Sequence, residues 1–245
     1  EIEKKFIQHM CSQEGVGVNI SINGKWDYTV DIWAESIMHF KRNYQKIMEE
    51  YERYVKSKQV VIETDFYYFK PKPILDKKSD EQITMTGDIE KMQLDEINKK
   101  ILQNLCKNCR ISLIELGKMT NLTPNAVKER IRKLEKENII LGYRLFIDYQ
   151  LLGFLHYRVF LHLENLSGEA ERKIIQFLKY HKSCVSITKT IGYDELEFRP
   201  IVRSVDEFYK LMEELRSNFS DYLKEYDSII YSKMHDVWNY FPFSE

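Results

Sequence analysis

An internal repeat is the sequence feature that most constrains the fold of this chain. Placing residue n beside residue n+168 aligns residues 1–69 with the C-terminal end of the chain without a gap. Besides the identical pairs, apolar residues of different types are aligned, for example Met10 with Leu178. The identical pairs include Glu3 with Glu171, Gly24 with Gly192, Ser36 with Ser204, Phe40 with Phe208 and Tyr54 with Tyr222. A self-match of this length is typical of duplicated units, so we predict two copies of one domain.

The second copy, residues 149–245, contains a complete set of strand and helix patterns. Alternating runs rich in β-branched and aromatic residues predict strands, and apolar residues three and four apart predict helices. The expected elements are a strand at 157–164, a helix at 167–181, strands at 184–191 and 196–203, a helix at 205–219 and a strand at 226–238. The order β-α-β-β-α-β predicts a ferredoxin-like domain, an antiparallel sheet with both helices on one face.

The first copy, residues 1–70, contains the same patterns except for the opening strand. Its expected elements are a helix at 3–11, strands at 16–22 and 26–33, a helix at 37–54 and a strand at 60–69. We expect the missing strand to precede Glu1, with a first helix-turn-helix ahead of it. Without that strand the sheet of the first copy has an unpaired edge.

Residues 71–92 are predicted to be a linker between the first copy and the next folded unit of the chain. They contain Pro71, Pro73 and the polar run SDEQITMTGD. Prolines combined with polar residues are typical of connecting segments. The stretch 93–148 is therefore expected to be a separate unit between the two copies.

The stretch 93–148 ends in a strong helix pattern. Thr123 is a residue type that caps helix N-termini, and Pro124 suits the first helical position because its missing N–H would have no partner there. At 100° per residue, Val127 and Leu134 fall on one side of this helix. That side is expected to be buried.

Two shorter helices are predicted before this one. The first begins after Asp95 and Glu96. Ser112 caps the second, in which Leu113, Leu116 and Met119 are the expected buried positions. The connection between the second and third helices is short, as in a helix-turn-helix. In such units the last helix of the pair enters the major groove of DNA.

The outer side of the third helix carries Asn125, Lys128, Glu129 and Arg132. Asn pairs well with adenine, Arg with guanine, and the remaining cations with phosphates. Residues 94–145 hold 11 Lys+Arg against 6 Asp+Glu, although the whole chain has a net charge of −1. A charged helix face is often only a solvated face, so the pattern alone leaves both interpretations open. The local positive charge favours DNA binding.

Several motifs of this stretch stand in a recognisable order and spacing. They are Leu94-Asp95, Val-x-x-Arg-Ile-x-x-Leu-Glu at 127–135, Ile-Ile-x-Gly-Tyr at 139–143 and Leu152-Gly153. In these motifs the chain resembles the Lrp/AsnC family of archaeal and bacterial transcription regulators, and its duplication resembles a tandem archaeal subgroup.

The resemblance implies that Thr123 and the helix from Pro124 to Arg132 contact double-stranded DNA. It also implies that the extended segment 142–147 links a winged helix-turn-helix to the sheet domain. Because this sheet domain mediates dimerisation in the family, we expect either a homo-oligomer (a dimer or higher) or pairing of the two copies within one chain.

The resemblance further implies an effector site at the turn between the central strands, where the family carries Gly-x-x-Asp. Backbone N–H groups and a carboxylate at such a turn can hold the two charges of an amino acid. Gly24 and Asp27 match the pattern in the first copy. In the second copy Gly192, Asp194 and Glu195 stand there, with Glu195 at the Asp position. The interpretation that both are only hairpin turns remains open.

No catalytic or metal site is predicted. Cys106 and Cys109 form a single C-x-x-C without further zinc ligands, so a buried thiol is the preferred interpretation of Cys106. The six histidines are scattered and no Gly-rich phosphate loop is present. We therefore predict neither a cofactor nor enzyme activity. Two alternatives remain: a siroheme decarboxylase-like tetrapyrrole enzyme on the same architecture, and an interaction module that does not bind DNA.

Composition is compatible with a cytoplasmic α+β protein. Hydrophobic residues make up 43% and charged residues 31% of the chain. No apolar run approaches the roughly 20 residues needed to cross a bilayer, and no secretory signal is recognisable. We expect no contact with a membrane.

Overall fold

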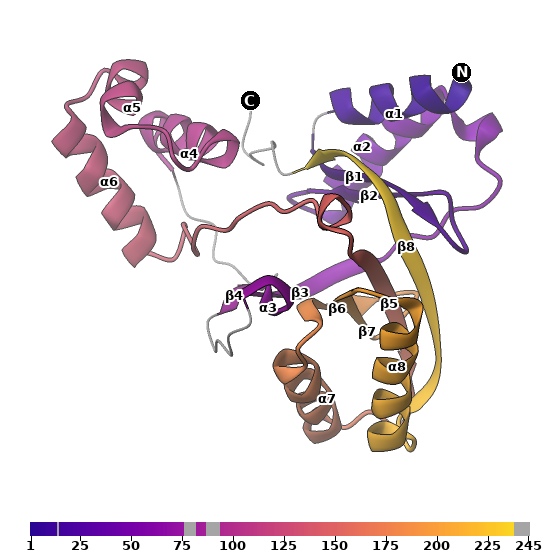
Figure 1. The fold of residues 1–245 in the computed structure, drawn as a ribbon. Coiled ribbons are helices and arrows are strands. Elements are labelled where there is room, and N and C mark those ends of the chain that lie inside the picture. The colour runs from indigo at the N-terminus through magenta and orange to yellow at the C-terminus, as the bar shows by residue number, and fades with distance from the viewer. Residues whose placement is uncertain (14, 76–81, 87–93, 238–245) are drawn as a thin grey trace.

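The computed structural model describes residues 1–13, 15–75, 82–86 and 94–237, which form a mixed α+β fold. One large antiparallel sheet has the strand order β2-β1-β8-β5-β7-β6-β3-β4. A unit of three helices lies to one side of the sheet (Figure 1). No helix within the described ranges is long and apolar enough to span a membrane.

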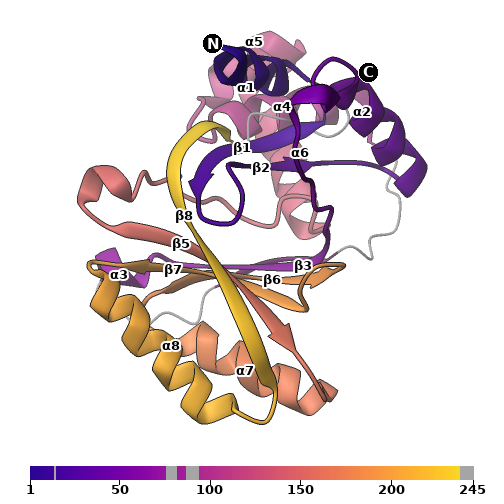
Figure 2. The ribbon, with the colours of Figure 1, turned by 90° about the vertical axis from the view of Figure 1, so that its right-hand side faces the viewer.

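The C-terminal half of the sheet is a complete β-α-β-β-α-β unit. Its strand order is β8-β5-β7-β6, and both helices cover the same face (Figure 2). Apolar side chains of both helices pack there against β5 and β7, and many of them are fully buried. The elements are β5 Leu155–Leu163, α7 Gly168–Tyr180, β6 Cys184–Ile191, β7 Leu196–Val202, α8 Val205–Phe219 and β8 Leu223–Val237.

The N-terminal half repeats five of these elements at the same spacing. Strands β1 and β6 begin and end 168 residues apart, and helices α2 and α8 begin 168 residues apart. A smaller apolar cluster around Met10, Val16 and Ile47 joins the two helices to the hairpin. The elements are α1 Ile2–Ser12, β1 Val16–Asn23, β2 Tyr28–Ile32, α2 Ile37–Glu49, the short helix η1 Glu52–Tyr54 and β3 Ile62–Phe69.

The last strand of each half pairs with the other half. The long strand β8 pairs with β5 and then crosses to β1, where Tyr231 lies opposite Ile22 (Figure 1). Strand β3 pairs with β6, where Glu63 lies opposite Thr190. These two residue pairs are related by the 168-residue offset, so the exchange is reciprocal. It merges the two predicted sheets into one.

The position that β5 takes between β7 and β8 has no counterpart in the first half within the described residues. Strand β2 pairs there only with β1, and residues 55–61 form no strand. The corresponding part of β8, residues 223–229, is paired with β5. The two halves therefore differ in one central strand.

The segment expected to be a plain linker, 71–92, contains two short elements. These are α3 Lys72–Leu75 and β4 Gln82–Thr86. Strand β4 pairs with β3 and extends the sheet by one strand. The physical reason is the alternation of Ile83 and Met85 with threonines, which favours a strand wherever a free sheet edge is near.

Candidate nucleic-acid interface

The three-helix unit is formed by α4 Glu96–Lys107, α5 Leu113–Thr120 and α6 Pro124–Lys136. Both predicted caps are present: the side chains of Ser112 and Thr123 accept backbone N–H groups of the first turns of α5 and α6. The side chain of Asp95 caps α4 in the same way, a cap that was not predicted from the sequence. Ser112 and Glu115 form a reciprocal capping box. Local hydrogen bonding therefore fixes where all three helices begin.

The turn between α5 and α6 is tight for two local reasons. Asn121 ends α5 in the left-handed conformation, with φ of 56°. A Cβ atom at Gly117 would lie 2.6 Å from the carbonyl oxygen of Leu122, so glycine permits the close approach of the connection. These features set the angle at which α6 leaves α5.

The inner side of α6 is sealed against the other two helices. Val127 and Leu134 are at most 1% exposed and pack against the fully buried Ile101 and Leu116. The expectation of a buried Met119 is wrong: its side chain is exposed, and Thr120 is buried in its place. The Thr120 hydroxyl can enter this core because it donates to the carbonyl oxygen of Leu116 at 2.6 Å.

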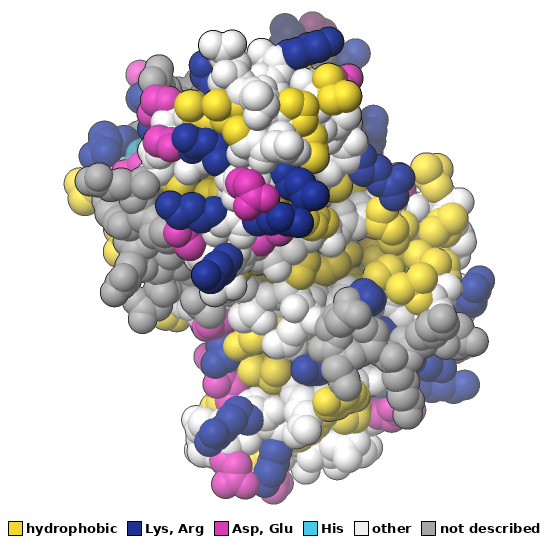
Figure 3. All heavy atoms as spheres, turned by 90° about the vertical axis from the view of Figure 1, so that its left-hand side faces the viewer, with side chains coloured by type: hydrophobic (Ala, Val, Ile, Leu, Met, Phe, Trp, Pro, Cys, Tyr) yellow, Lys and Arg dark blue, Asp and Glu magenta, His cyan; other side chains and the backbone are white. Residues whose placement is uncertain are grey.

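The outer side of α6 and its N-cap Thr123 together supply the six residues that the sequence predicts to contact DNA. Each of their side chains is exposed, and they follow one another along one helix face. Figure 3 shows lysines and arginines, interspersed with acidic side chains, over this side of the molecule. The six residues are Thr123, Pro124, Asn125, Lys128, Glu129 and Arg132.

The cations of α6 differ in how they are held. Arg130 donates to the Asp95 carboxylate at 2.6 Å and to Asn98 at 3.0 Å, which ties α6 to α4. The hydrogen bond from Arg130 holds the pKa of Asp95 below its ordinary value. Arg132 pairs with Glu129 at 2.8 Å on the exposed face. Lys128 has no ion-pair partner among the described residues, so its ammonium is available to a phosphate.

The two hairpin turns predicted to hold an effector lie against each other. Lys25 donates to the Tyr193 hydroxyl at 2.5 Å, and the rings of Trp26 and Tyr193 are 5.1 Å apart. Gly24 and Gly192 both have positive φ, of 146° and 129°, as tight turns require. Contact between the turns runs through Lys25, Trp26 and Tyr193, three residues outside the predicted effector set.

The acidic residues of these turns have different surroundings. Asp27 is exposed, whereas Asp194 is 2% exposed and accepts from the Thr190 hydroxyl at 3.0 Å. Burial, together with the negative charge of Glu197, raises the pKa of Asp194 to about 7. Glu195 accepts the backbone N–H of Leu163 at 2.7 Å. Asp194 and Glu195 therefore both take part in the hydrogen bonding of the sheet.

A buried charge cluster lies on the face of the sheet opposite α7 and α8, and no sequence motif signals it. Arg158 of β5 donates to Glu197 at 2.6 Å and to Glu63 of β3 at 3.1 Å. The Arg158 side chain is 7% exposed and the Glu197 side chain is 0% exposed. Arg199 lies 3.7 Å from both carboxylates. The cluster connects the two halves of the sheet by charge.

Cys106 and Cys109 are both exposed, which corrects the expectation of a buried thiol at Cys106. Cys106 lies in the last turn of α4, on a side of the helix that is exposed to solvent. Within the described ranges, no group of three or more His, Cys, Asp or Glu side chains is placed to hold a metal ion.

Comparison with known proteins gives consistent matches. A family model described as winged helix-turn-helix DNA-binding matches residues 94–140. An HTH-type transcriptional regulator of Pyrococcus furiosus is 34% identical over 132 residues, which cover 54% of this chain and 83% of that protein. The HTH-type transcriptional regulator LrpC of Bacillus subtilis is 29% identical over 144 residues, covering 58% and 95% of the two chains.

Solved structures show likeness in fold. An AsnC family transcriptional regulator from Agrobacterium tumefaciens has a TM-score of 0.54 at 15% identity, over 61% of this chain and 97% of that chain. A transcriptional regulator from Neisseria meningitidis, solved as an L-Met complex, has a TM-score of 0.51 at 18% identity, over 58% and 91%. The matched length corresponds to one helix-turn-helix with one sheet unit.

Proposed function

Because the chain belongs to the Lrp/AsnC family of transcription regulators, we propose that α6 reads a specific double-stranded DNA sequence from the major groove. The observation that carries this proposal is the two-sided nature of α6. Its inner side closes the core of the three-helix unit, and its outer side presents an amide, a carboxylate and two cations to solvent. The names of the relatives are those of regulators, which favours this role over an enzyme.

The roles of the individual side chains follow from their chemistry. Asn125 matches adenine, and Arg132 matches guanine or a phosphate. Glu129 can accept from cytosine N4 and also orients Arg132 in the free protein through their 2.8 Å contact. Lys128 is suited to a phosphate, because its ammonium has no ion-pair partner within the described part of the chain and can pair with the phosphate charge.

A salt series tests this proposal. The affinity of the intact chain for a preferred genomic fragment and for random DNA is measured at rising salt. The logarithm of the affinity is expected to fall steeply with the logarithm of salt, since each neutralised phosphate contributes a slope of about −0.9. A flat dependence would contradict DNA binding by this face.

Two variants, each with a control, test whether the outer side of α6 is the surface that binds DNA. Lys128→Ala should weaken binding to all sequences and reduce the salt slope by about 1, and Arg132→Ala should relax base preference at about 1–3 kcal/mol. Lys210→Ala, at an exposed lysine of α8, is the control for the first. Lys173→Ala, whose ammonium pairs with Glu169 at 2.7 Å on α7, is the control for the second. Equal effects of variant and control would remove the assignment.

The two halves of the sheet are proposed to be two ferredoxin-like domains that pair within one chain. The reciprocal ladders of β8 with β1 and of β3 with β6 support this. An intramolecular pair does not dissociate on dilution, so we expect the unfolding midpoint to be independent of protein concentration. A midpoint that rises with concentration would instead indicate pairing between chains.

A second candidate function, effector binding at the paired turns, is favoured by one specific observation. Asp194 Oδ1 is buried and has no hydrogen-bond partner among the described residues. An amino-acid ammonium would satisfy it, and the Neisseria meningitidis regulator was solved with L-Met. Calorimetric titration with L-Met, compared between the native chain and Asp194→Asn, tests this. Equal heats in both would place any L-Met binding elsewhere.

A further inference from the structure

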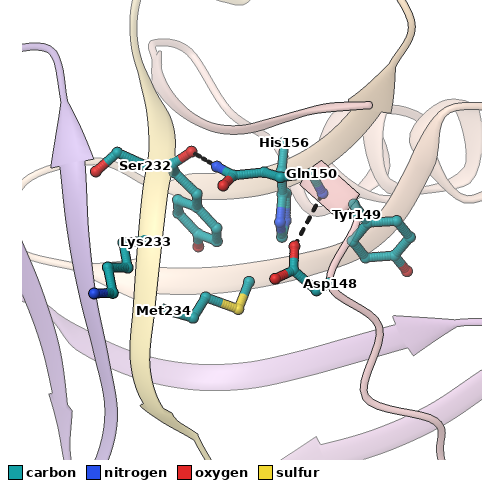
Figure 4. A pocket seen from close by; sticks show the side chains of 8 residues that line it. Asp148, Tyr149, Gln150, His156, Ser232, Lys233 and Met234 are labelled. Atoms are coloured by element: carbon teal, nitrogen blue, oxygen red, sulfur yellow. Dashed lines mark hydrogen bonds between the residues drawn. The ribbon is translucent and has the colours of Figure 1, made fainter. Parts of the chain in front are cut away.

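A pocket of about 180 Å³ lies where the segment after the helix-turn-helix meets the sheet (Figure 4). Its walls include Asp148 and Gln150 of that segment, His156 of β5 and Met234 of β8. Figure 4 shows Asp148, His156 and Met234 directed toward the same space, whereas Lys233 extends away from it. None of these residues belongs to α6 or to the hairpin turns, so the pocket is separate from both.

His156 is a buried residue in the wall of this pocket. The residue is 7% exposed, and neither ring nitrogen has a hydrogen-bond partner among the described residues. Burial, helped by the charge of Arg199, lowers the pKa of His156 to about 3, so the ring is neutral. A neutral imidazole has one N–H donor and one acceptor nitrogen. Since buried polar groups are normally hydrogen-bonded, the acceptor nitrogen of the ring points to a ligand with a hydrogen-bond donor.

Two further acceptors line the mouth of the pocket. Asp148 Oδ1 accepts the backbone N–H groups of Gln150 at 3.1 Å and Leu151 at 3.4 Å, which leaves Oδ2 for a ligand. The Gln150 amide nitrogen donates to the carbonyl oxygen of Tyr231, which leaves its amide oxygen as an acceptor. A carboxylate, an imidazole nitrogen and an amide oxygen thus surround one small space.

We propose that this pocket binds the ammonium group of a small primary amine. An ammonium has three N–H donors and no acceptor, which matches three acceptors of which one is charged. The Tyr231 ring, centred 4.2 Å from the His156 ring, adds an aromatic surface that attracts cations. The positive charge of Arg199, behind Tyr231, is offset by Glu63 and Glu197, each 3.7 Å away.

The position of the pocket gives this binding a structural consequence. Asp148 and Gln150 belong to the connection between α6 and the sheet, whereas His156 and Met234 belong to the sheet itself. An ammonium bound by both sets holds the connection against the sheet. We therefore expect amine binding to slow hydrogen exchange of the backbone amides at 148–152.

The test is a titration of the intact chain with propylamine and with propyltrimethylammonium. Both cations carry the same charge, but the second has no N–H donor. Calorimetry should detect saturable binding of propylamine. The quaternary ion should bind at least about tenfold more weakly than propylamine. In histidine-labelled protein, the ring signals of His156 should shift with propylamine.

Variants separate the pocket from general attraction to a negative surface. Gln150→Ala and His156→Phe should each weaken propylamine binding about tenfold, because each removes one acceptor for a charged donor. Gln150 is exposed, so its variant tests the pocket even if His156→Phe misfolds. Lys233→Ala is the control and should leave binding unchanged or tighter. Equal binding of both cations, absence of saturable binding, or indifference to Gln150→Ala would each overturn the proposal.

Discussion

The two halves of the sheet share five helices and strands at the same spacing, but only the second half has β5 among the described residues, and the two are not equally packed. In the second half the Phe208 ring of α8 is buried and stacks on Tyr157 of β5, with ring centroids 4.0 Å apart. The corresponding residue of α2, Phe40, is half-buried and stacks on Tyr44 of its own helix at 5.7 Å. The apolar pattern of a helix thus sets which side faces the sheet, whereas its burial depends on a strand from elsewhere in the chain.

The largest expected effect tests this comparison directly. Phe208→Ala should lower the free energy of unfolding by about 3–5 kcal/mol, because it opens a cavity in a sealed core. Phe40→Ala should cost about 1 kcal/mol, since the side chain of Phe40 is only half-buried. Guanidinium unfolding followed by circular dichroism measures both. Equal losses would mean that the two halves are packed alike.

The next prediction tests the buried charge cluster around Arg158, which connects the two halves. Arg158→Met should destabilise the chain by about 3 kcal/mol, because the buried Glu197 would lose its partner at 2.6 Å and keep only Arg199 at 3.7 Å. The double variant Arg158→Met with Glu197→Leu should recover most of the loss, since an apolar pair replaces a buried ion pair. If the double variant is no more stable than the single one, packing rather than charge explains the effect of Arg158.

A pH dependence sharpens the comparison, because its source lies on β5, the strand without a counterpart in the described first half. His156 binds a proton near pH 6.5 when unfolded but only near pH 3 when folded. Stability is therefore lost as pH falls from 6.5 toward 3, and moving from pH 7 to pH 5 should cost about 2 kcal/mol from this group.

The measurement for His156 is the difference between the native chain and His156→Phe in unfolding at pH 7 and pH 5. Asp194 and Glu63, whose pKa values burial raises to about 7, act in the opposite direction, because the folded state takes up their protons first. Their contribution is common to both proteins and cancels in the difference. A native chain and variant with parallel pH profiles would contradict the prediction.

The smallest expected effect concerns what the halves have in common. Ser36 accepts the backbone N–H of His39 at 3.1 Å, and Ser204 accepts that of Glu207 at 3.2 Å, so equivalent serines cap α2 and α8. Replacing either by Ala should cost about 1 kcal/mol, the usual value of an N-cap. Equal losses in thermal unfolding would show that local capping is independent of the packing difference. A much smaller loss at Ser36 would show that α2 is already loosely held.

The sequence predicted best those features that depend on neighbours along the chain. Hydrogen bonds and side-chain spacing within a few residues account for the caps at Ser112 and Thr123, for the buried side of α6 and for its four outward residues. Predictions of burial that depend on contacts with distant parts of the chain were less accurate. Met119 has the spacing of a buried residue, but no helix of the described ranges covers it, and Cys106 is exposed for the same reason.

The sequence by itself therefore determined the order of helices and strands outside the segment 71–92, the 168-residue repeat and the face that α6 presents. Only the tertiary structure decided that β3 pairs with β6 and β8 with β1, that β4 extends the sheet, and that Asp148, Gln150 and His156 enclose a pocket. The physical reason is that backbone hydrogen bonds are the same for every residue, so a strand carries little information about its partner. The partner is chosen by which sheet edge lies within reach once the helices have packed.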